Sequence, residues 1–179
     1  NRPAFFLFFH LWKKVGADGG FTWVYYEPLK DTPADAIVSA FPGFRDGYEQ
    51  HHPSIDYRGG DTLRETLDAA MKGPWKIIQL VTWNDYGEGT MTEPTHEFGY
   101  AFLEIIQQAR RKELGETFPF TADDLRLPAL LYELRKKARG DPAAKALLDQ
   151  ASALLSAGKY TDTKELLMKL RVTSPPRQP

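Results

Sequence analysis

The stretch that most constrains the fold runs from Lys76 to Thr90 and begins with the apolar run Ile77-Ile-Gln-Leu-Val81. The run lacks the strict alternation of apolar and polar residues that marks a strand with one face in water. Such a pattern is typical of a strand that is covered on both faces, as in a parallel sheet. The run therefore predicts an α/β fold in which this strand is central.

Polar, aromatic and glycine residues follow where this strand should end: Trp83, Asn84, Asp85, Gly87, Glu88 and Gly89. In parallel folds, residues that handle ligands lie at the carboxyl ends of strands. Two carboxylates beside an aromatic ring are what glycosidic bond cleavage requires: one protonates the leaving oxygen, and the other activates water or attacks. The same spacing also arises where Asp85 or Asn84 closes a turn and Glu88 is solvated, so spacing alone leaves both interpretations open.

The string Trp83-Asn-Asp-Tyr-Gly-Glu-Gly-Thr90, followed by Glu93-Pro94, resembles the active-site segment of glycoside hydrolase families 71 and 99 and their bacterial relatives. Family 71 contains fungal α-1,3-glucanases with Trp-Asn-Asp-Tyr-Gly-Glu-Ser. Family 99 contains endo-α-mannosidases with Asn-Glu-Trp-His-Glu-Gly-Thr. This chain combines the Asp-Tyr-Gly-Glu core of the first with the Gly-Thr ending of the second. The resemblance is strongest over residues 57–107.

The resemblance implies a (β/α)8 barrel of the TIM type and hydrolysis of an α-linked glucan or mannan, oligosaccharide or polysaccharide. It implies that Glu88 is the general acid and Asp85 the base, with inversion expected by analogy to family 71. Trp83 and Tyr86 would stack on or shape a sugar ring, and Asn84 would bind a hydroxyl or orient a carboxylate. The resemblance also favours a periplasmic or secreted location.

Further apolar segments predict strands at residues 4–11, 21–27 and 36–41, with a turn at 15–20. Amphipathic segments predict helices at residues 62–71 and 98–111. At the start of the first, Thr62 and Glu65 fit a capping box, with Asp61 as a rival cap. His10 and Glu27 lie near predicted strand ends, either as sugar contacts or as structural and solvated residues. Glu93 is a further acidic candidate in the loop after the central strand.

A long loop over residues 42–60 carries many stacking and hydrogen-bonding groups, including Arg45 and Tyr48. Long loops in compact domains are often functional, so we expect this one to cover the sugar subsites, with an ordinary solvated loop as the alternative. The neighbouring His51 and His52 do not indicate a metal site, because adjacent histidines rarely face one ion.

Composition narrows the remaining classes of function. The 179 residues fall short of the ~250 of a complete barrel, and we expect the chain to be the carboxyl-terminal part of a longer protein whose missing half completes it. Lys+Arg 23 against Asp+Glu 24 leaves no basic face that would indicate nucleic acid. No apolar run is long enough to span a membrane, no cysteine is present, and no nucleotide-binding motif implies a cofactor.

Beyond Gly115 the sequence becomes rich in Leu, Ala, Lys and Glu. We predict that residues 1–115 form part of the barrel, 116–174 a helical appendix, and 175–179 a disordered tail. Helices are expected at residues 127–134, 142–155 and 161–170, with Asp141 capping the second. Two other functions stay open: a non-catalytic carbohydrate-binding barrel remnant, and a protein-interaction module that uses the helical tail.

Overall fold

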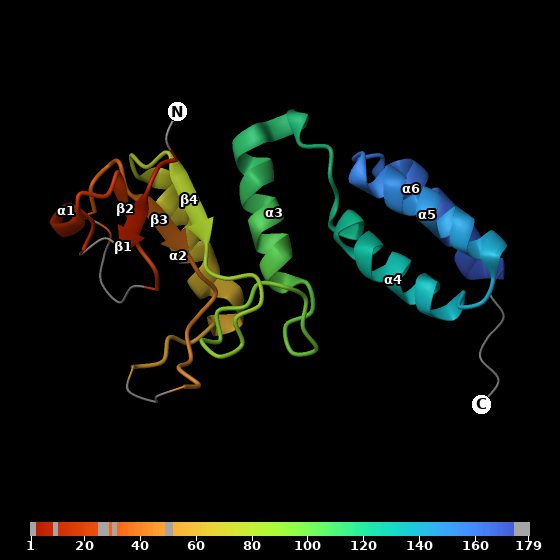
Figure 1. Ribbon diagram of the computed structural model, residues 1–179, viewed down its shortest axis with the longest axis horizontal. Helices are drawn as coiled ribbons and strands as arrows, with labels where there is room; N and C mark the ends of the chain where they lie inside the picture. The colour runs from red at the N-terminus through yellow and green to blue at the C-terminus, as the bar shows by residue number, and fades with distance from the viewer. Residues whose placement is uncertain (1–2, 9–10, 25–28, 30–31, 49–51, 174–179) are drawn as a thin grey trace. The chain divides into compact units, whose positions relative to one another are not determined.

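The computed structural model describes residues 3–8, 11–24, 29, 32–48 and 52–173 (Figure 1). Two compact units divide the chain, unit 1 from Asn1 to Thr117 and unit 2 from Phe118 to Pro179. Two residues with predicted sugar contacts, His10 and Glu27, lie outside the described residues, as does the predicted tail at 175–179.

Unit 1 is built on a parallel sheet whose strands lie in chain order, β1 (Phe6–Phe8), β2 (Gly19–Phe21), β3 (Ile37–Ala40) and β4 (Ile77–Leu80). The register pairs Phe8 with Phe21, Phe21 with Ile37, and Ile37 with Ile77. The predicted α/β class, with a parallel sheet and covering helices, is confirmed. The predicted central, doubly covered place of the 77–81 strand is wrong for the described sheet, because β4 is the last strand in its order and Ile77 and Leu80 are 52% and 41% exposed. Because all four strands are parallel, their carboxyl ends meet at one edge, which is where the predicted site residues lie.

The second strand begins earlier than the sequence predicts. The sequence predicts a turn at residues 15–20 and a strand at 21–27, but β2 begins at Gly19 and ends at Phe21. A short helix, α1 (Trp12–Val15), is ended by Gly16 in the left-handed conformation and returns the chain to the sheet. A Cβ on Gly19 would come within 2.5 Å of the Phe6 ring, so the glycine allows β1 and β2 to pair at this register.

Helices cover one face of the sheet. Helix α2 (Asp61–Lys72) lies behind the strands in Figure 1, and α3 (Ala101–Leu114) packs beside α2. The core between them and β3 consists of Ala40, Leu63, Leu67, Phe102 and Ile105. Burying large apolar side chains of this kind contributes ~1.5–3 kcal/mol each. A short 3-10 helix, η3 (Gly115–Thr117), follows α3.

The predicted capping box at the start of α2 is wrong. The 3-10 helix η2 (Arg58–Gly60) leads directly into α2, so Gly60 is the N-cap, and both Thr62 and the rival cap Asp61 already lie inside the helix. The Thr62 hydroxyl instead donates to the carbonyl of Asp56 at 2.5 Å, and Glu65 forms an ion pair with Arg58.

The opposite face of the sheet carries a polar network that explains the glutamine in the apolar run. The Gln79 amide donates to the Thr22 carbonyl at 2.5 Å and to the Ser39 hydroxyl at 3.0 Å. The Ser39 hydroxyl also donates to the Thr22 carbonyl, and Ser39 is fully buried. Three strand segments are therefore joined by side chains as well as by their backbone ladders, just before the edge where the site lies.

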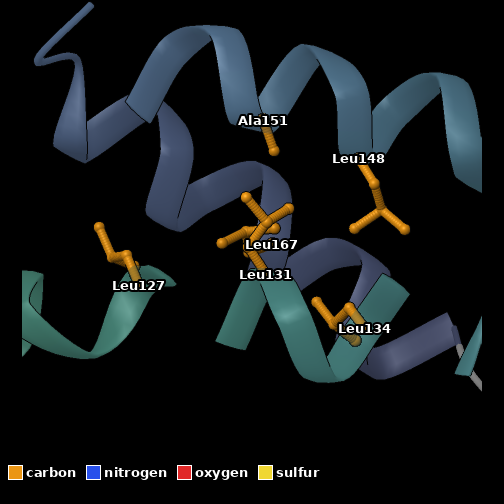
Figure 2. Packing of buried hydrophobic residues seen from close by; sticks show 6 residues of the cluster. All are labelled: Leu127, Leu131, Leu134, Leu148, Ala151 and Leu167. Carbon is orange, nitrogen blue, oxygen red and sulfur yellow. The ribbon is translucent and has the colours of Figure 1, made fainter. Parts of the chain in front are cut away.

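Unit 2 is helical, with η4 (Ala122–Arg126), α4 (Leu127–Lys137), α5 (Pro142–Ser156) and α6 (Tyr160–Thr173). Figure 2 shows its core of Leu127, Leu131, Leu134, Leu148, Ala151 and Leu167. The predicted cap is confirmed, because the Asp141 carboxylate accepts from the amides of Ala143 and Ala144 at 2.9 and 3.0 Å. None of the described helices combines the length and the apolar composition of a membrane-spanning segment.

Candidate active site

The loops that follow β3 and β4 lie together at one end of unit 1 (Figure 1). The β4 loop is closed at its base by threonines. The Thr82 amide donates to the Thr90 carbonyl at 2.7 Å, and the Thr92 amide and hydroxyl donate to the Thr82 carbonyl at 3.0 and 2.6 Å. Thr90 and Thr92 are buried. The intervening residues, 83–89, are therefore held as one projecting loop on a rigid base.

Asp85 organises the interior of this loop. Its Oδ1 atom accepts the backbone N–H of Glu88 at 2.9 Å, and its own N–H donates to the Thr82 hydroxyl at 3.0 Å. Its carbonyl accepts the Thr90 N–H at 3.1 Å. Asp85 thus closes a turn, one of the two roles that the sequence left open, and the same bond sets the position of Glu88.

Glu88 is held at three points that come from different strand ends. Its N–H donates to Asp85, and its carbonyl accepts the Arg45 N–H, from the β3 loop, at 2.8 Å. The Oε2 atom of its half-buried side chain accepts the indole N–H of Trp23, just beyond β2, at 2.7 Å. Trp23 was not among the predicted site residues. It fell inside a predicted strand 65 residues away, and no sequence pattern pointed to the contact.

Glycines allow the β3 loop to lie directly against the β4 loop. The Gly47 N–H donates to the Gly87 carbonyl at 2.7 Å, and the Tyr57 hydroxyl donates to the Gly89 carbonyl at 2.6 Å. A Cβ on Gly87 would overlap the Tyr48 ring, and Gly89 has φ +62°. Burial raises the pKa of the Tyr57 hydroxyl, and the neighbouring Glu97 carboxylate adds to this effect.

Exposed aromatic side chains lie on the same two loops as the two carboxylates. Trp83, Tyr86 and Tyr48 are 55%, 59% and 74% exposed, and Tyr48 lies against Gly87. The Tyr86 hydroxyl donates to Glu93 Oε1 at 2.8 Å, and this hydrogen bond raises the pKa of Tyr86. Glu93 therefore holds the rim of the loop through Tyr86. Large exposed rings of this kind form surfaces on which sugar rings can stack.

The remaining predicted residues are placed as follows. Asn84 is exposed on the same loop, and Arg45 is exposed with its backbone bound to Glu88. Of the two adjacent histidines, His52 packs edge-on against Phe44, and His51 lies outside the described residues. Among the residues that the structure describes, no group of three or more His, Asp or Glu side chains is arranged to hold a metal ion.

Comparison with known proteins finds similarity at the level of structure. No protein-family model matches the sequence, and no curated protein matches it. The chain is similar to two structures of the glycoside hydrolase family 99 endo-α-mannosidase from Bacteroides thetaiotaomicron, the second in complex with bis-tris-propane. The first has 18% identity and a TM-score of 0.48 over 67% of this chain, and the second 19% and 0.45 over 63%. The chain spans 46% of the length of each. Family 99 is one of the two families that the sequence string resembles.

Proposed function

We propose that this chain carries the acid and base of a glycoside hydrolase that cleaves an α-linked glucan or mannan. The observation that carries the proposal is the placement of Asp85 and Glu88. They share one rigid loop at the carboxyl ends of parallel strands and are joined through the Asp85 carboxylate and the Glu88 amide. Exposed aromatic rings lie on the same loop.

In this proposal Glu88 gives its proton to the glycosidic oxygen as the bond to the anomeric carbon breaks. Asp85 takes a proton from a water molecule whose oxygen bonds to the opposite face of that carbon. The products are a free sugar hydroxyl and an inverted reducing end. Trp83, Tyr86 and Tyr48 supply stacking surfaces, while Asn84 and Arg45 supply hydrogen bonds to sugar hydroxyls.

A second candidate function is sugar binding without chemistry. The observation that favours it is the structural use of the acidic residues: Asp85 closes the turn and Glu93 holds Tyr86. Exposed rings bind sugars without any acid or base. This candidate predicts binding that persists when both proposed catalytic carboxylates are made neutral.

The test is reducing-end release from α-1,3-glucan and α-mannan by the full chain, in parallel with Glu88→Gln and Asp85→Asn. Glu65→Gln and Asp68→Asn are matched controls, because both carboxylates are exposed on α2 and lie outside the site. Release that is lost in the first pair and kept in the controls supports the hydrolase. Saturable glycan binding by all five proteins, with no release by any, would establish the binding function instead.

A further inference from the structure

Trp23 lies just beyond the end of β2, and several hydrogen bonds hold the backbone that leads into it. The residue before it, Thr22, is buried, and its N–H donates to the Ile37 carbonyl at 2.9 Å. The Thr22 hydroxyl accepts the Ser39 N–H at 2.8 Å, and its carbonyl accepts from Ser39 and Gln79. The backbone entering Trp23 is therefore held by both β3 and β4.

The indole ring itself is packed by aromatic neighbours on the sheet. Its centroid lies 6.4 Å from that of Phe21 and 6.5 Å from that of Phe8, both in edge-on geometry. Phe8 and Phe21 are in turn 4.7 Å apart. Edge-on contacts of this kind restrict the orientation of a ring. The N–H of Trp23 therefore points in a direction that the strands determine.

That N–H ends on Glu88 Oε2 at 2.7 Å. An indole nitrogen only donates, so the oxygen that faces it must accept in either protonation state of the carboxyl group. The carbonyl oxygen of a protonated carboxyl group is a better acceptor than its hydroxyl oxygen, so this contact favours the proton of Glu88 on Oε1. The donor is neutral, so it orients the carboxyl group without the full positive charge that a Lys or Arg donor would place beside it.

We propose that Trp23 is a positioning residue for general-acid catalysis: its indole N–H occupies Glu88 Oε2 and directs the transferable proton to Oε1. This inference rests on the function proposed above. With the Glu88 amide bound by Asp85 and its carbonyl by Arg45, the indole completes the restraint of the acid from backbone to carboxyl group.

The test compares Trp23→Phe with the wild-type full chain on two substrates that share one α-linked sugar and differ in leaving group. One is an α-1,3-linked gluco-oligosaccharide or an α-linked manno-oligosaccharide, whichever the wild type cleaves, and its leaving oxygen needs a proton. The other is the matching α-glycosyl fluoride, whose fluoride leaves without one. General-acid assistance is worth ~10²–10⁴-fold, so losing its alignment should slow the oligosaccharide by about tenfold to a hundredfold and leave the fluoride within a few-fold. A structural role would slow both substrates equally.

Two further proteins keep the result interpretable. Trp75→Phe is the matched control, because its indole N–H also makes one bond, to the Pro33 carbonyl at 2.9 Å, on another part of unit 1. It should leave the ratio of the two rates unchanged. Should Trp23→Phe unfold, 3-benzothienylalanine at position 23 removes the N–H while keeping the ring size, and the same rate ratio decides.

The contact is also measured without activity, from the indole ¹H–¹⁵N signal of Trp23, which should move upfield in Glu88→Ala. Two results would overturn the positioning role and leave the hydrolase intact. One is an unmoved Trp23 signal in Glu88→Ala, and the other is an equal loss of rate on both substrates in Trp23→Phe when the wild type is active. A wild-type protein that cleaves no α-glycoside overturns the hydrolase and with it the role of Trp23 in catalysis. In that case a moved signal would leave the contact as a structural one.

Discussion

Asp85 makes a structural hydrogen bond and is also proposed to act as the general base. Two substitutions distinguish these two roles. Its Oδ1 atom accepts the Glu88 N–H at 2.9 Å. Asp85→Asn keeps an acceptor oxygen of the same size in that place but removes the negative charge that the base needs. Asp85→Ala removes both the oxygen and the charge. The two variants should therefore differ in stability and agree in activity.

The expected sizes follow from the geometry. Removing the acceptor of a partly buried backbone N–H costs about 1–2 kcal/mol. With an unfolding entropy of about 2.1 cal/mol/K per residue, this lowers the melting temperature of a unit of 117 residues by roughly 4–8 °C. Asp85→Asn should lose less than half of this. Both variants should lose about 10²–10⁴-fold in hydrolysis, because a general base acts in the transition state.

Thermal unfolding followed by circular dichroism and reducing-end release on the same preparations provide both readouts, with Asp68→Asn as the control for an exposed carboxylate. Near-wild-type hydrolysis by Asp85→Asn would refute the base assignment and leave Asp85 as a turn residue. Equal melting temperatures for Asp85→Ala and the wild type would refute the structural bond. The two refutations are independent, because each concerns a different property of the carboxyl group.

Three further predictions concern the rim of the site and the helical unit. In Gly87→Ala the new methyl group would displace the exposed Tyr48 ring at little cost in stability. Calorimetric titration should therefore show weaker oligosaccharide binding, and the melting temperature should stay unchanged. A large fall in melting temperature would contradict this. The hydrogen bond to Glu93 raises the pKa of Tyr86. The stability that this bond gives the folded protein is therefore present below the ordinary tyrosine pKa, and it is lost as the pH rises through the pKa of Tyr86 in the folded state. Glu93→Gln should therefore move the ultraviolet-detected ionisation of Tyr86 to lower pH, and an unmoved titration would count against the bond. Leu148 is 1% exposed, so Leu148→Ala should lower the free energy of unfolding of unit 2 by about 2–5 kcal/mol. Thermal unfolding should show this loss while hydrolysis persists. A loss of hydrolysis would instead link the two units functionally.

Much of the fold follows from local pattern. The run Ile77–Val81 predicts the parallel strand β4, and the amphipathic segments beside it predict α2 and α3. Its lack of alternation does not predict its place, because β4 is an edge strand of the described sheet. Asp141 followed by proline predicts its helix start, since both act within one turn. The start of β2 was missed because Gly19 and Gly20 signal a turn locally, and only the Phe6 ring across the sheet explains a glycine inside a strand.

The contacts of the candidate site likewise fall into one that a local sequence pattern predicts and one that it does not. The turn between Asp85 and Glu88 was open to prediction because its donor and acceptor are three residues apart. The bond from Trp23 was not, because it depends on which strand-end side chains meet once β2, β3 and β4 are in register. Parallel topology brings every carboxyl end to one edge, but register and side-chain packing select the pairs that touch. A sequence pattern can therefore identify the candidate carboxyl groups of a site, whereas the residue that orients a carboxyl group is identified only in the folded structure.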